Sequence, residues 1–177
     1  MIKFRNIKGT HDLLPEEVSI WRQVENIIHF IMEQHGFGEI RTPVFEHTDL
    51  FIRGIGTDTD IVSKEMYSWK DQGDNLLTLR PELTAPVARA YIQHQLANKN
   101  PMHRLYYLDS LFRRERPQKG RQRQFHQFGA EAIGSPNPEQ DAEIIAVAYN
   151  MFEKFKITNM TVVLNSIGSQ EIRPKYL

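Results

Sequence analysis

The chain has 177 residues, of which 40% are hydrophobic and 25% are charged, and its formal net charge at pH 7 is zero. These values are typical of one soluble globular domain with enough chain to bury a core. No secretory signal and no apolar run near the roughly 20 residues of a membrane span are present, so we expect neither a secreted nor a membrane protein. Because cysteine is absent, disulfides and thiolate zinc sites are excluded, and we expect a cytoplasmic protein.

The N-terminal part of the chain predicts a turn, a helix and a strand. Residues 8–15 (KGTHDLLP) combine glycine, aspartate and proline as a turn that enters a helix does, with Pro15 near the first helical position. Residues 16–35 repeat apolar side chains every three to four positions, and Gly36 is typical of a helix end. Residues 40–44 alternate as a strand does, although the proline inside them restricts that strand to an edge or a bulge.

The middle of the chain predicts a connection, a hairpin and a second helix. Residues 50–60 contain glycines and indicate a connection. Residues 65–70 and 76–79 are predicted to be the two strands of a hairpin around the turn sequence DQGDN. The helix that follows is expected to extend to about residue 96, with Thr84 as its N-cap.

The C-terminal part of the chain predicts one more helix and one more strand. Residues 139–155 repeat apolar side chains at helical spacing, and residues 160–164 read as a strand. The seven histidines are scattered, without the spacing of a metal site, so no metal-ligating residue is predicted.

Residues 104–131 are the most distinctive stretch and read as strand, basic loop and strand. The first strand opens with apolar and aromatic residues, as a buried strand does, and PQKG in the loop is typical of a turn. Residues 113–123 hold five arginines, one lysine and one glutamate, a local net charge of +5 in a neutral chain. The second strand alternates, which predicts one face with Phe125, Gln127, Gly129 and Glu131 and another with His126, Phe128 and Ala130.

The basic hairpin has two interpretations. The planar guanidinium of arginine can donate to two phosphate oxygens at once and stays protonated, so five arginines suit the binding of a polyanion. The ring of Phe125 adds a flat surface on which a nucleotide base could stack. The simpler interpretation is a solvated basic hairpin or a loose RNA-binding patch. Glu115, Gln127 and Glu131 favour instead a pocket for a phosphate, an amine and a hydrogen-bonding side chain, because a site for phosphate alone has no use for carboxylates.

The run over residues 112–127 (FRRERPQKGRQRQFHQ) resembles motif 2 of class II aminoacyl-tRNA synthetases, in the form found in histidyl-tRNA synthetases. Residues 8–15 match the G-x-x-D-x-x-P pattern with which that family commonly opens. The helix and the proline-containing strand within residues 16–46 are similar to motif 1, which forms the dimer interface of class II enzymes. The resemblance therefore implies a homodimer through this region.

The fold that the resemblance implies is α+β, an antiparallel sheet flanked by helices and incomplete at its C-terminus. Residues 1–177 would be the N-terminal part of the catalytic domain, containing motifs 1 and 2. Motif 3 and the anticodon-binding domain would lie beyond Leu177.

The activity that the resemblance implies is that of a histidine–tRNA ligase. Such an enzyme joins histidine and ATP into histidyl-adenylate and pyrophosphate and then transfers histidine to tRNA(His); this chain alone is expected to be weak or inactive. Mg²⁺ would arrive with ATP. Arg113 is the expected catalytic residue, at the α-phosphate and the histidine carboxylate. The resemblance assigns histidine binding to Glu82, Thr84, Gln127 and Glu131, and ATP binding to Arg113, Glu115, Arg121, Arg123 and Phe125.

Individual roles follow from the same resemblance. Glu82 and Thr84 would bind the α-amino group, although Leu83 between them replaces the glycine that is common in the family. Without the resemblance, Glu82 is simply an acid favoured by the dipole of the following helix. Glu131 would read the imidazole, and Glu115 would accept a hydrogen bond from the adenine amino group.

Two other functions remain open from the sequence. The synthetase-like regulatory subunit of ATP phosphoribosyltransferase has a similar fold and does not activate histidine, so it has no need of the ATP-binding arginines and acids found here. A plain RNA-binding module would predict salt-sensitive RNA binding without specificity for ATP or histidine.

Overall fold

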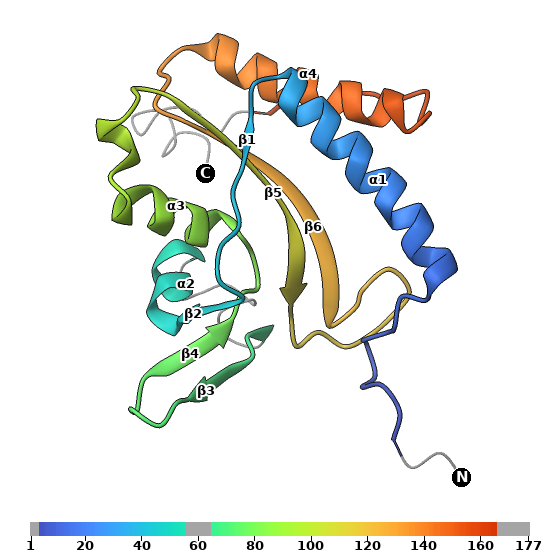
Figure 1. Ribbon diagram of the computed structural model, residues 1–177, viewed down its shortest axis with the longest axis vertical. Coiled ribbons are helices and arrows are strands. Elements are labelled where there is room, and N and C mark those ends of the chain that lie inside the picture. Colours follow the sequence, from blue (N-terminus) through green and yellow to red (C-terminus); the bar gives the residue numbers. More distant parts are fainter. Residues whose placement is uncertain (1–3, 56–64, 166–177) are drawn as a thin grey trace.

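Two three-stranded sheets and four α-helices form the part of the chain that the computed structural model describes, residues 4–55 and 65–165. In chain order the elements are α1 (Pro15–Gln34), β1 (Gly38–Glu39), β2 (Phe45–His47), α2 (Thr48–Ile55), β3 (Ser68–Lys70), β4 (Leu76–Leu79), α3 (Thr84–Gln93), the 3₁₀ turn η2 (Leu96–Asn98), β5 (His103–Phe112), β6 (Gln124–Ile133) and α4 (Pro138–Lys154). Figure 1 shows the long β5–β6 hairpin between α1 and α4 on one side and α2, α3 and the smaller sheet on the other.

The larger sheet has the order β1-β5-β6, in which β1 is parallel to β5 and β5 is antiparallel to β6. The smaller sheet has the order β2-β4-β3 and is antiparallel throughout. The predicted α+β class is therefore confirmed, and β1 adds one parallel neighbour to the expected antiparallel pairing. In the hairpin, the cross-strand partners that matter for the site are Leu105 with Glu131, Tyr107 with Gly129, Asp109 with Gln127 and Leu111 with Phe125.

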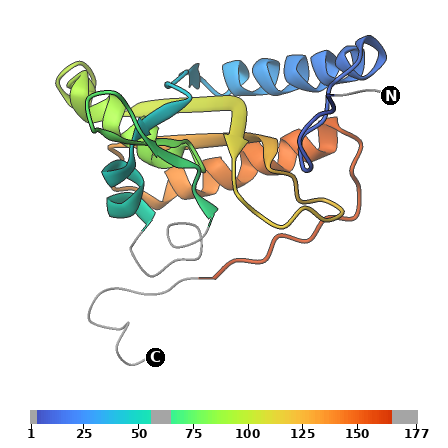
Figure 2. The same cartoon turned by 90° about the horizontal axis from the view of Figure 1, so that it is seen from below.

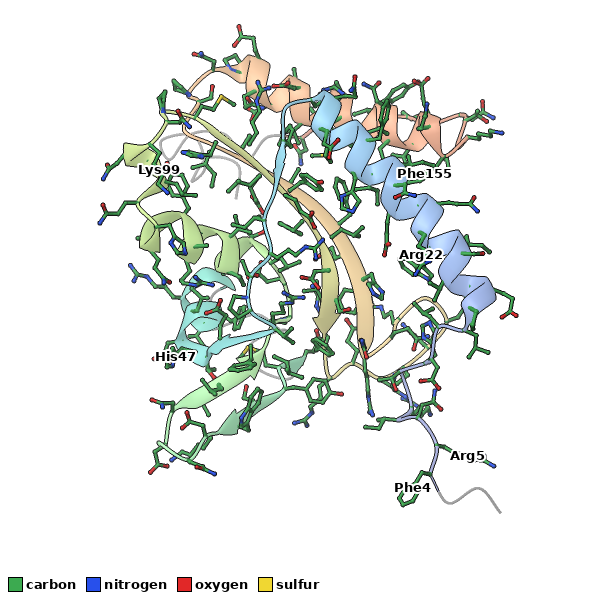
Figure 3. The ribbon with its side chains drawn as sticks, in the orientation of Figure 1. Phe4, Arg5, Arg22, His47, Lys99 and Phe155 are labelled. Carbon is green, nitrogen blue, oxygen red and sulfur yellow. The ribbon has the colours of Figure 1, made fainter. Side chains whose placement is uncertain are left out.

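Each face of the β5–β6 hairpin packs against a different set of helices. On one face, Tyr106, Phe128 and Ala130 join a core with residues of α1 and α4, and Phe155 lies in the same core where α4 ends beside α1 (Figure 3). On the other face, the core contains Leu83, Val87, Tyr107 and Leu111, with Phe125 packed against them. The predicted alternation of the second strand is confirmed, and the predicted site residues of β6 share the α3 side.

α1 begins and ends close to the predicted positions because both ends carry strong local signals. Pro15 is its first residue, where a missing N–H has no consequence. The carboxylate of Glu17 accepts a hydrogen bond from the backbone N–H of Leu14 at 3.3 Å. At the other end Gly36 has a φ of +71°, and the N–H of Phe37 bonds the carbonyl of Met32 at 2.9 Å. This left-handed glycine with a six-residue closing bond is a Schellman motif.

The predicted strand over residues 40–44 is wrong. The segment lies between β1 and β2 and crosses from the larger sheet to the smaller one. Pro43 has no N–H for a strand ladder, and the carbonyl of Thr42 accepts from Nη1 of Arg80 at 2.8 Å. The alternating side chains therefore belong to a crossing that a buried arginine holds, and not to a pleated strand.

Several element bounds also differ from the predictions. The predicted connection over residues 50–60 is wrong for its first part, which belongs to α2, and residues 56–60 lie outside the described residues. β3 is shorter than residues 65–70, and α3 ends before residue 96, where η2 takes over.

Residues 160–164 do not form the predicted strand. A strand needs a neighbour for its backbone N–H and carbonyl groups, and no strand among the described residues pairs with this segment. In the view from below, the segment runs away from the sheet after α4 (Figure 2). Among the described residues, no helix combines the length and the apolar character that crossing a membrane requires.

Candidate active site

The carboxylate of Glu131 on β6 is held by two hydroxyl groups on the α3 side of the hairpin. Oγ1 of Thr84, the first residue of α3, donates to Glu131 Oε1 at 2.8 Å. The hydroxyl of Tyr107 on β5 donates to the same oxygen at 3.3 Å. Two donors from different elements restrict the carboxylate to one orientation, and its other oxygen takes no hydrogen bond from the residues that the structure describes. That oxygen is the natural acceptor for an N–H of a ligand.

Glu82 lies beside this group, just before α3. Its carboxylate accepts a hydrogen bond from the backbone N–H of Ala85 at 3.0 Å, which gives a partner to one of the N–H groups in the first turn of the helix. The prediction of Thr84 as N-cap is wrong, because Leu83 is the N-cap and Thr84 is already helical. Burial raises the pKa of Glu82, and the charge of Glu131 raises it further, against the lowering effect of the Ala85 N–H. Two carboxylates so close together suit a cationic ligand such as an amine.

Replacing Glu82 by glutamine is expected to stabilise the fold at neutral pH. Because folding raises the pKa of Glu82, the folded state holds the proton more readily, and the free energy of unfolding falls as pH rises from the ordinary glutamate pKa through the raised one. Glutamine keeps an acceptor for Ala85 and removes the charge. Urea unfolding at about pH 7 and at about pH 3.5, above and below the range in which Glu82 titrates, measures the difference in the free energy of unfolding between the variant and the wild type.

The expected result is a more stable Glu82→Gln variant near neutral pH and little difference in acid. Glu139→Gln, an exposed acid in the first turn of α4, is the matched control. An equal increase in the free energy of unfolding at both pH values would contradict this explanation, because the increase would then not come from removing the charge of Glu82.

Arg113 follows directly after β5, and its guanidinium is fixed from two sides. Nε donates to the carbonyl of Pro81 at 2.9 Å, and Cζ lies 5.2 Å from the centre of the Phe125 ring. Nη1 is 3.9 Å from a carboxylate oxygen of Glu115, and the side chain is 23% exposed. Since Pro81 directly precedes Glu82, one short segment places both the arginine and the acid. The guanidinium of Arg113 is thus bonded to the residue directly before Glu82.

The basic loop folds around Glu115, whose side chain is 13% exposed. Nη1 of Arg121 lies 3.4 Å from its carboxylate, and Nε of Arg123 donates to its backbone carbonyl at 3.4 Å. The backbone N–H of Arg113 donates to the carbonyl of Arg123 at 2.9 Å and closes the base of the loop. The three arginines predicted to bind ATP therefore gather around the acid predicted to read adenine.

Phe125 and Gln127 lie between the acids and the arginines on the same face of β6. Phe125 is half-buried against the core under α3, and the guanidinium of Arg113 lies over its ring. Gln127 is exposed, two strand positions from Phe125 and four from Glu131. Glu82 and Glu131 therefore lie at the α3 end of the hairpin, whereas Glu115 lies with the three arginines at its loop end.

Sequence reasoning missed Tyr107 as a site residue and predicted it only as part of a buried strand. Burial raises the pKa of Tyr107 to about 12, so its hydroxyl keeps its proton and acts as a donor at neutral pH. The cross-strand register brings that hydroxyl to Glu131. The alternation of β5 alone contains no signal for this contact, because it does not define the register with β6.

Arg80 was also missed, and it is the most deeply buried charged residue among those described, with 1% exposure. Its guanidinium donates to the carbonyl of Ser110 at 2.9 Å, bonds Thr42 in the crossing segment, and forms an ion pair with Asp109. It fixes the segment that leads to Glu82 against β5. The only sequence signal for this role was the position of Arg80 two residues before the predicted site residue Glu82.

Gly129 leaves the space that the ring of Tyr107 occupies. The two residues are direct cross-strand partners, and a Cβ on Gly129 would collide with the Tyr107 ring and hydroxyl. Gly129→Ala is therefore expected to destabilise the fold by about 1–3 kcal/mol and to move the hydroxyl away from Glu131. Urea unfolding measures the loss. Gly38→Ala is the control, because the nearest atom to its Cβ is 4.0 Å away, and equal losses in both variants would contradict the explanation.

The comparison with sequence families agrees with this geometry. Residues 9–170 match the family described as histidyl-tRNA synthetase. The chain belongs to the histidyl-tRNA synthetase family. Among similar proteins, the histidine–tRNA ligase of Chloroherpeton thalassium is 53% identical over 173 residues, which cover 97% of this chain and 40% of that protein. The histidine–tRNA ligase of Staphylococcus epidermidis is 52% identical over 170 residues, which cover 96% of this chain and 40% of that protein.

Solved structures show the same histidyl-tRNA synthetase fold. The structure of apo histidyl-tRNA synthetase from S. aureus matches with a TM-score of 0.80 and 40% identity, covering 99% of this chain and 40% of that one. A protein from Bacillus halodurans, described as an ATP phosphoribosyltransferase regulatory subunit/histidyl-tRNA synthetase, matches with a TM-score of 0.74 and 26% identity, covering 89% of this chain and 40% of that one. The chain spans about 40% of the length of the relatives it matches.

Proposed function

We propose that this chain forms the part of a histidine–tRNA ligase that binds histidine and ATP and joins them into histidyl-adenylate. Residues 1–177 would be the N-terminal part of the catalytic domain, with motifs 1 and 2, and motif 3 and the anticodon-binding domain would belong to later residues. The observation that carries the proposal is the contact of Arg113 with Pro81, because it bonds the guanidinium to the segment that continues into Glu82 and Thr84, and Thr84 orients the carboxylate of Glu131.

Histidine fits the acid end of the site through its two nitrogen-bearing groups. The α-ammonium group would lie against Glu82, supported by Thr84 and Gln127. An imidazole N–H would donate to the oxygen of Glu131 that Thr84 and Tyr107 leave available. A site made of such groups rejects analogues that lack a matching N–H, because its polar atoms would remain unpaired.

The reaction requires positioning and charge stabilisation from these residues. The histidine carboxylate attacks the α-phosphorus of ATP, a new carboxyl–phosphate bond forms, and pyrophosphate leaves with the electron pair of the broken phosphorus–oxygen bond. The attacking group is already ionised, so no general base is needed. Arg113 would stabilise the negative charge that grows on the α-phosphate oxygens.

The nucleotide would bind along the loop end of the hairpin. Arg121 and Arg123 would contact the outer phosphates, Glu115 would accept from the adenine amino group, and Phe125 would contact the adenine ring. The described residues contain no cluster of three His, Asp or Glu side chains suited to a metal ion. Mg²⁺ would enter on the phosphates of ATP and lower their charge.

The regulatory-subunit alternative rests on fold similarity. The related Bacillus halodurans structure is 26% identical, whereas the histidine–tRNA ligases named above are 52–53% identical. The gathering of arginines around Glu115 favours the ligase, because a subunit that does not activate histidine has no use for such an ATP site.

The experiment that tests the proposed function is amino-acid-dependent ATP–pyrophosphate exchange at high protein concentration. We expect weak exchange with histidine and none with other amino acids. Where exchange is absent, calorimetric titrations with histidine and ATP decide the function: binding of both supports the ligase, and histidine without ATP supports the regulatory subunit. Binding of neither would contradict the proposal for this chain.

A homodimer through residues 16–46 is part of the same proposal. Ile20 on α1 is 62% exposed and Phe45 on β2 is 51% exposed, which leaves apolar surface on this region. Sedimentation equilibrium should show a dimer for the wild type and a monomer for the double variant Ile20→Asp/Phe45→Asp. A wild-type monomer at all concentrations would contradict this part. Transfer to tRNA(His) and a cytoplasmic location also remain proposals.

A further inference from the structure

The segment before α1 contacts the basic loop where that loop rejoins the sheet. The carbonyl of Gly9 accepts from the backbone N–H of Arg123 at 2.7 Å and from that of Gln124 at 3.3 Å. Figure 1 shows this N-terminal segment, in dark blue, meeting the loop between β5 and β6. Phe4 and Arg5 lie farther out along the segment (Figure 3). The contact of Gly9 therefore holds the end of the loop from outside the hairpin.

Gly9 presents its carbonyl because it sits in a tight turn. The N–H of Thr10 donates to the carbonyl of Ile7 at 2.9 Å, and Oγ1 of Thr10 donates to the same carbonyl at 2.8 Å. The side-chain amide of Asn6 donates to the carbonyl of Thr10 at 2.7 Å. Gly9 has a φ of +90°, which a type II turn requires at its third residue. The turn is thus closed by its own bonds and forms a rigid support.

A side chain at position 9 would strain the backbone and push its neighbours aside. A side chain would be strained at this positive φ, since the left-handed region suits glycine. A Cβ would also lie 2.8 Å from Cγ of Arg123 and 2.9 Å from Cγ of Pro117. Both of these residues belong to the basic loop. The turn and the loop therefore pack without space between them.

We propose that the turn over residues 6–10 is a positioning element for ATP, which acts by holding Arg123. This inference rests on the proposed function. Arg123 supports the rest of the nucleotide site, because its Nε donates to the carbonyl of Glu115 at 3.4 Å and its carbonyl accepts from the N–H of Arg113 at 2.9 Å. The contacts of Gly9 lead to the ATP end of the hairpin, whereas Thr84 and Tyr107 orient Glu131 at the other end. Loss of the contact should therefore weaken ATP binding and leave histidine binding unchanged.

The test compares Gly9→Ala with Gly36→Ala. Gly36 also has a positive φ, of +71°, but the nearest atom to its Cβ is the end of a flexible arginine at 3.8 Å. Exchange of the Arg123 and Gln124 amide protons, followed by NMR, reports the contact directly. With one net hydrogen bond lost, Gly9→Ala should speed exchange of these amides by about tenfold and weaken ATP binding by about five- to tenfold. Histidine affinity should stay within about twofold, and Gly36→Ala should change none of these values.

A second variant covers the case in which Gly9→Ala does not fold. Thr10→Val removes one hydrogen bond inside the turn without adding a collision. It should therefore also speed exchange of the Arg123 and Gln124 amide protons and weaken ATP binding, both by a smaller factor than Gly9→Ala. Unchanged amide exchange in the variants would overturn the inference, as would equal losses of ATP and histidine affinity or the same effects in Gly36→Ala. If the wild type binds no ATP, the proposed function fails. The contact of Gly9 is tested separately, because fast exchange of the Arg123 and Gln124 amide protons in the wild type would overturn the inference.

Discussion

Arg113→Ala is expected to reduce histidine-dependent ATP–pyrophosphate exchange by about 10²- to 10³-fold, the usual loss when a preorganised donor to developing charge is removed. The guanidinium is 23% exposed, and its Nε is already bonded to the Pro81 carbonyl. Its orientation is therefore set by the protein, and we expect it to stabilise the charge that grows on the α-phosphate without reorganising. Alanine removes the donors and leaves the Pro81 carbonyl without this partner.

Two further variants separate the role of Arg113 from general effects of charge and stability. Arg113→Lys keeps the positive charge and loses the planar fork, so it should restore only a small part of the activity. Arg104→Ala removes another arginine of the same hairpin, near the start of β5 and far from the loop, where the guanidinium pairs with Glu143 of α4 at 2.6 Å. It should leave exchange per folded molecule close to that of the wild type. Equal losses in Arg113→Ala and Arg104→Ala would contradict the proposed role.

Glu131→Ala is expected to weaken histidine binding by about 10- to 100-fold while ATP affinity changes by less than about twofold. The carboxylate is oriented by Thr84 at 2.8 Å and Tyr107 at 3.3 Å, so its loss removes the acceptor for the imidazole and also leaves two hydroxyl groups without their partner. Paired titrations with histidine and with ATP, on the same protein preparation, measure the two affinities.

The control for this prediction is Glu139→Ala, which removes an exposed acid from the first turn of α4. It should leave both affinities unchanged. Thr84→Val tests the orienting contact, because it keeps the shape of the side chain and removes the hydroxyl that donates to Glu131; a smaller loss of histidine affinity is expected. If Glu131→Ala weakened ATP and histidine equally, the assignment of Glu131 to the imidazole would be wrong.

The residues that carry these predictions were identified from the sequence to different degrees. The acids Glu115 and Glu131 stood out in the sequence, because a site for phosphate alone has no use for carboxylates. Arg113 and Glu82 received their specific places in the site only from the family resemblance. The structure places Glu131 and Phe125 on the α3 side of the hairpin, as the alternation of the second strand predicted. Their assigned roles remain proposals. Tyr107 and Arg80 were missed, because Tyr107 was read only as a residue of a buried strand and Arg80 only as the residue where the chain leaves a strand.

Local periodicity predicted α1, α4 and the long hairpin, since an amphipathic helix or an alternating strand must present one apolar face to a core wherever that core lies. Turn residues such as Pro15 and Gly36 marked the ends of α1 for the same local reason. The family resemblance added the expected α+β class. These features depend on residues a few positions apart, and such spacings are visible in a chain without its structure.

The site contacts depend on residues that are far apart in the chain. Arg113 meets Pro81 across 32 positions, and Thr84 meets Glu131 across 47. The same is true of residues 40–44, whose alternation predicted a strand and whose path is set by Arg80, a partner 38 positions from Thr42. Periodicity states which side of an element is buried, but it does not define the register or the partner. Packing of α3 and the crossing segment against the β5–β6 hairpin supplies both, and so orients Glu131 and Arg113 within one site.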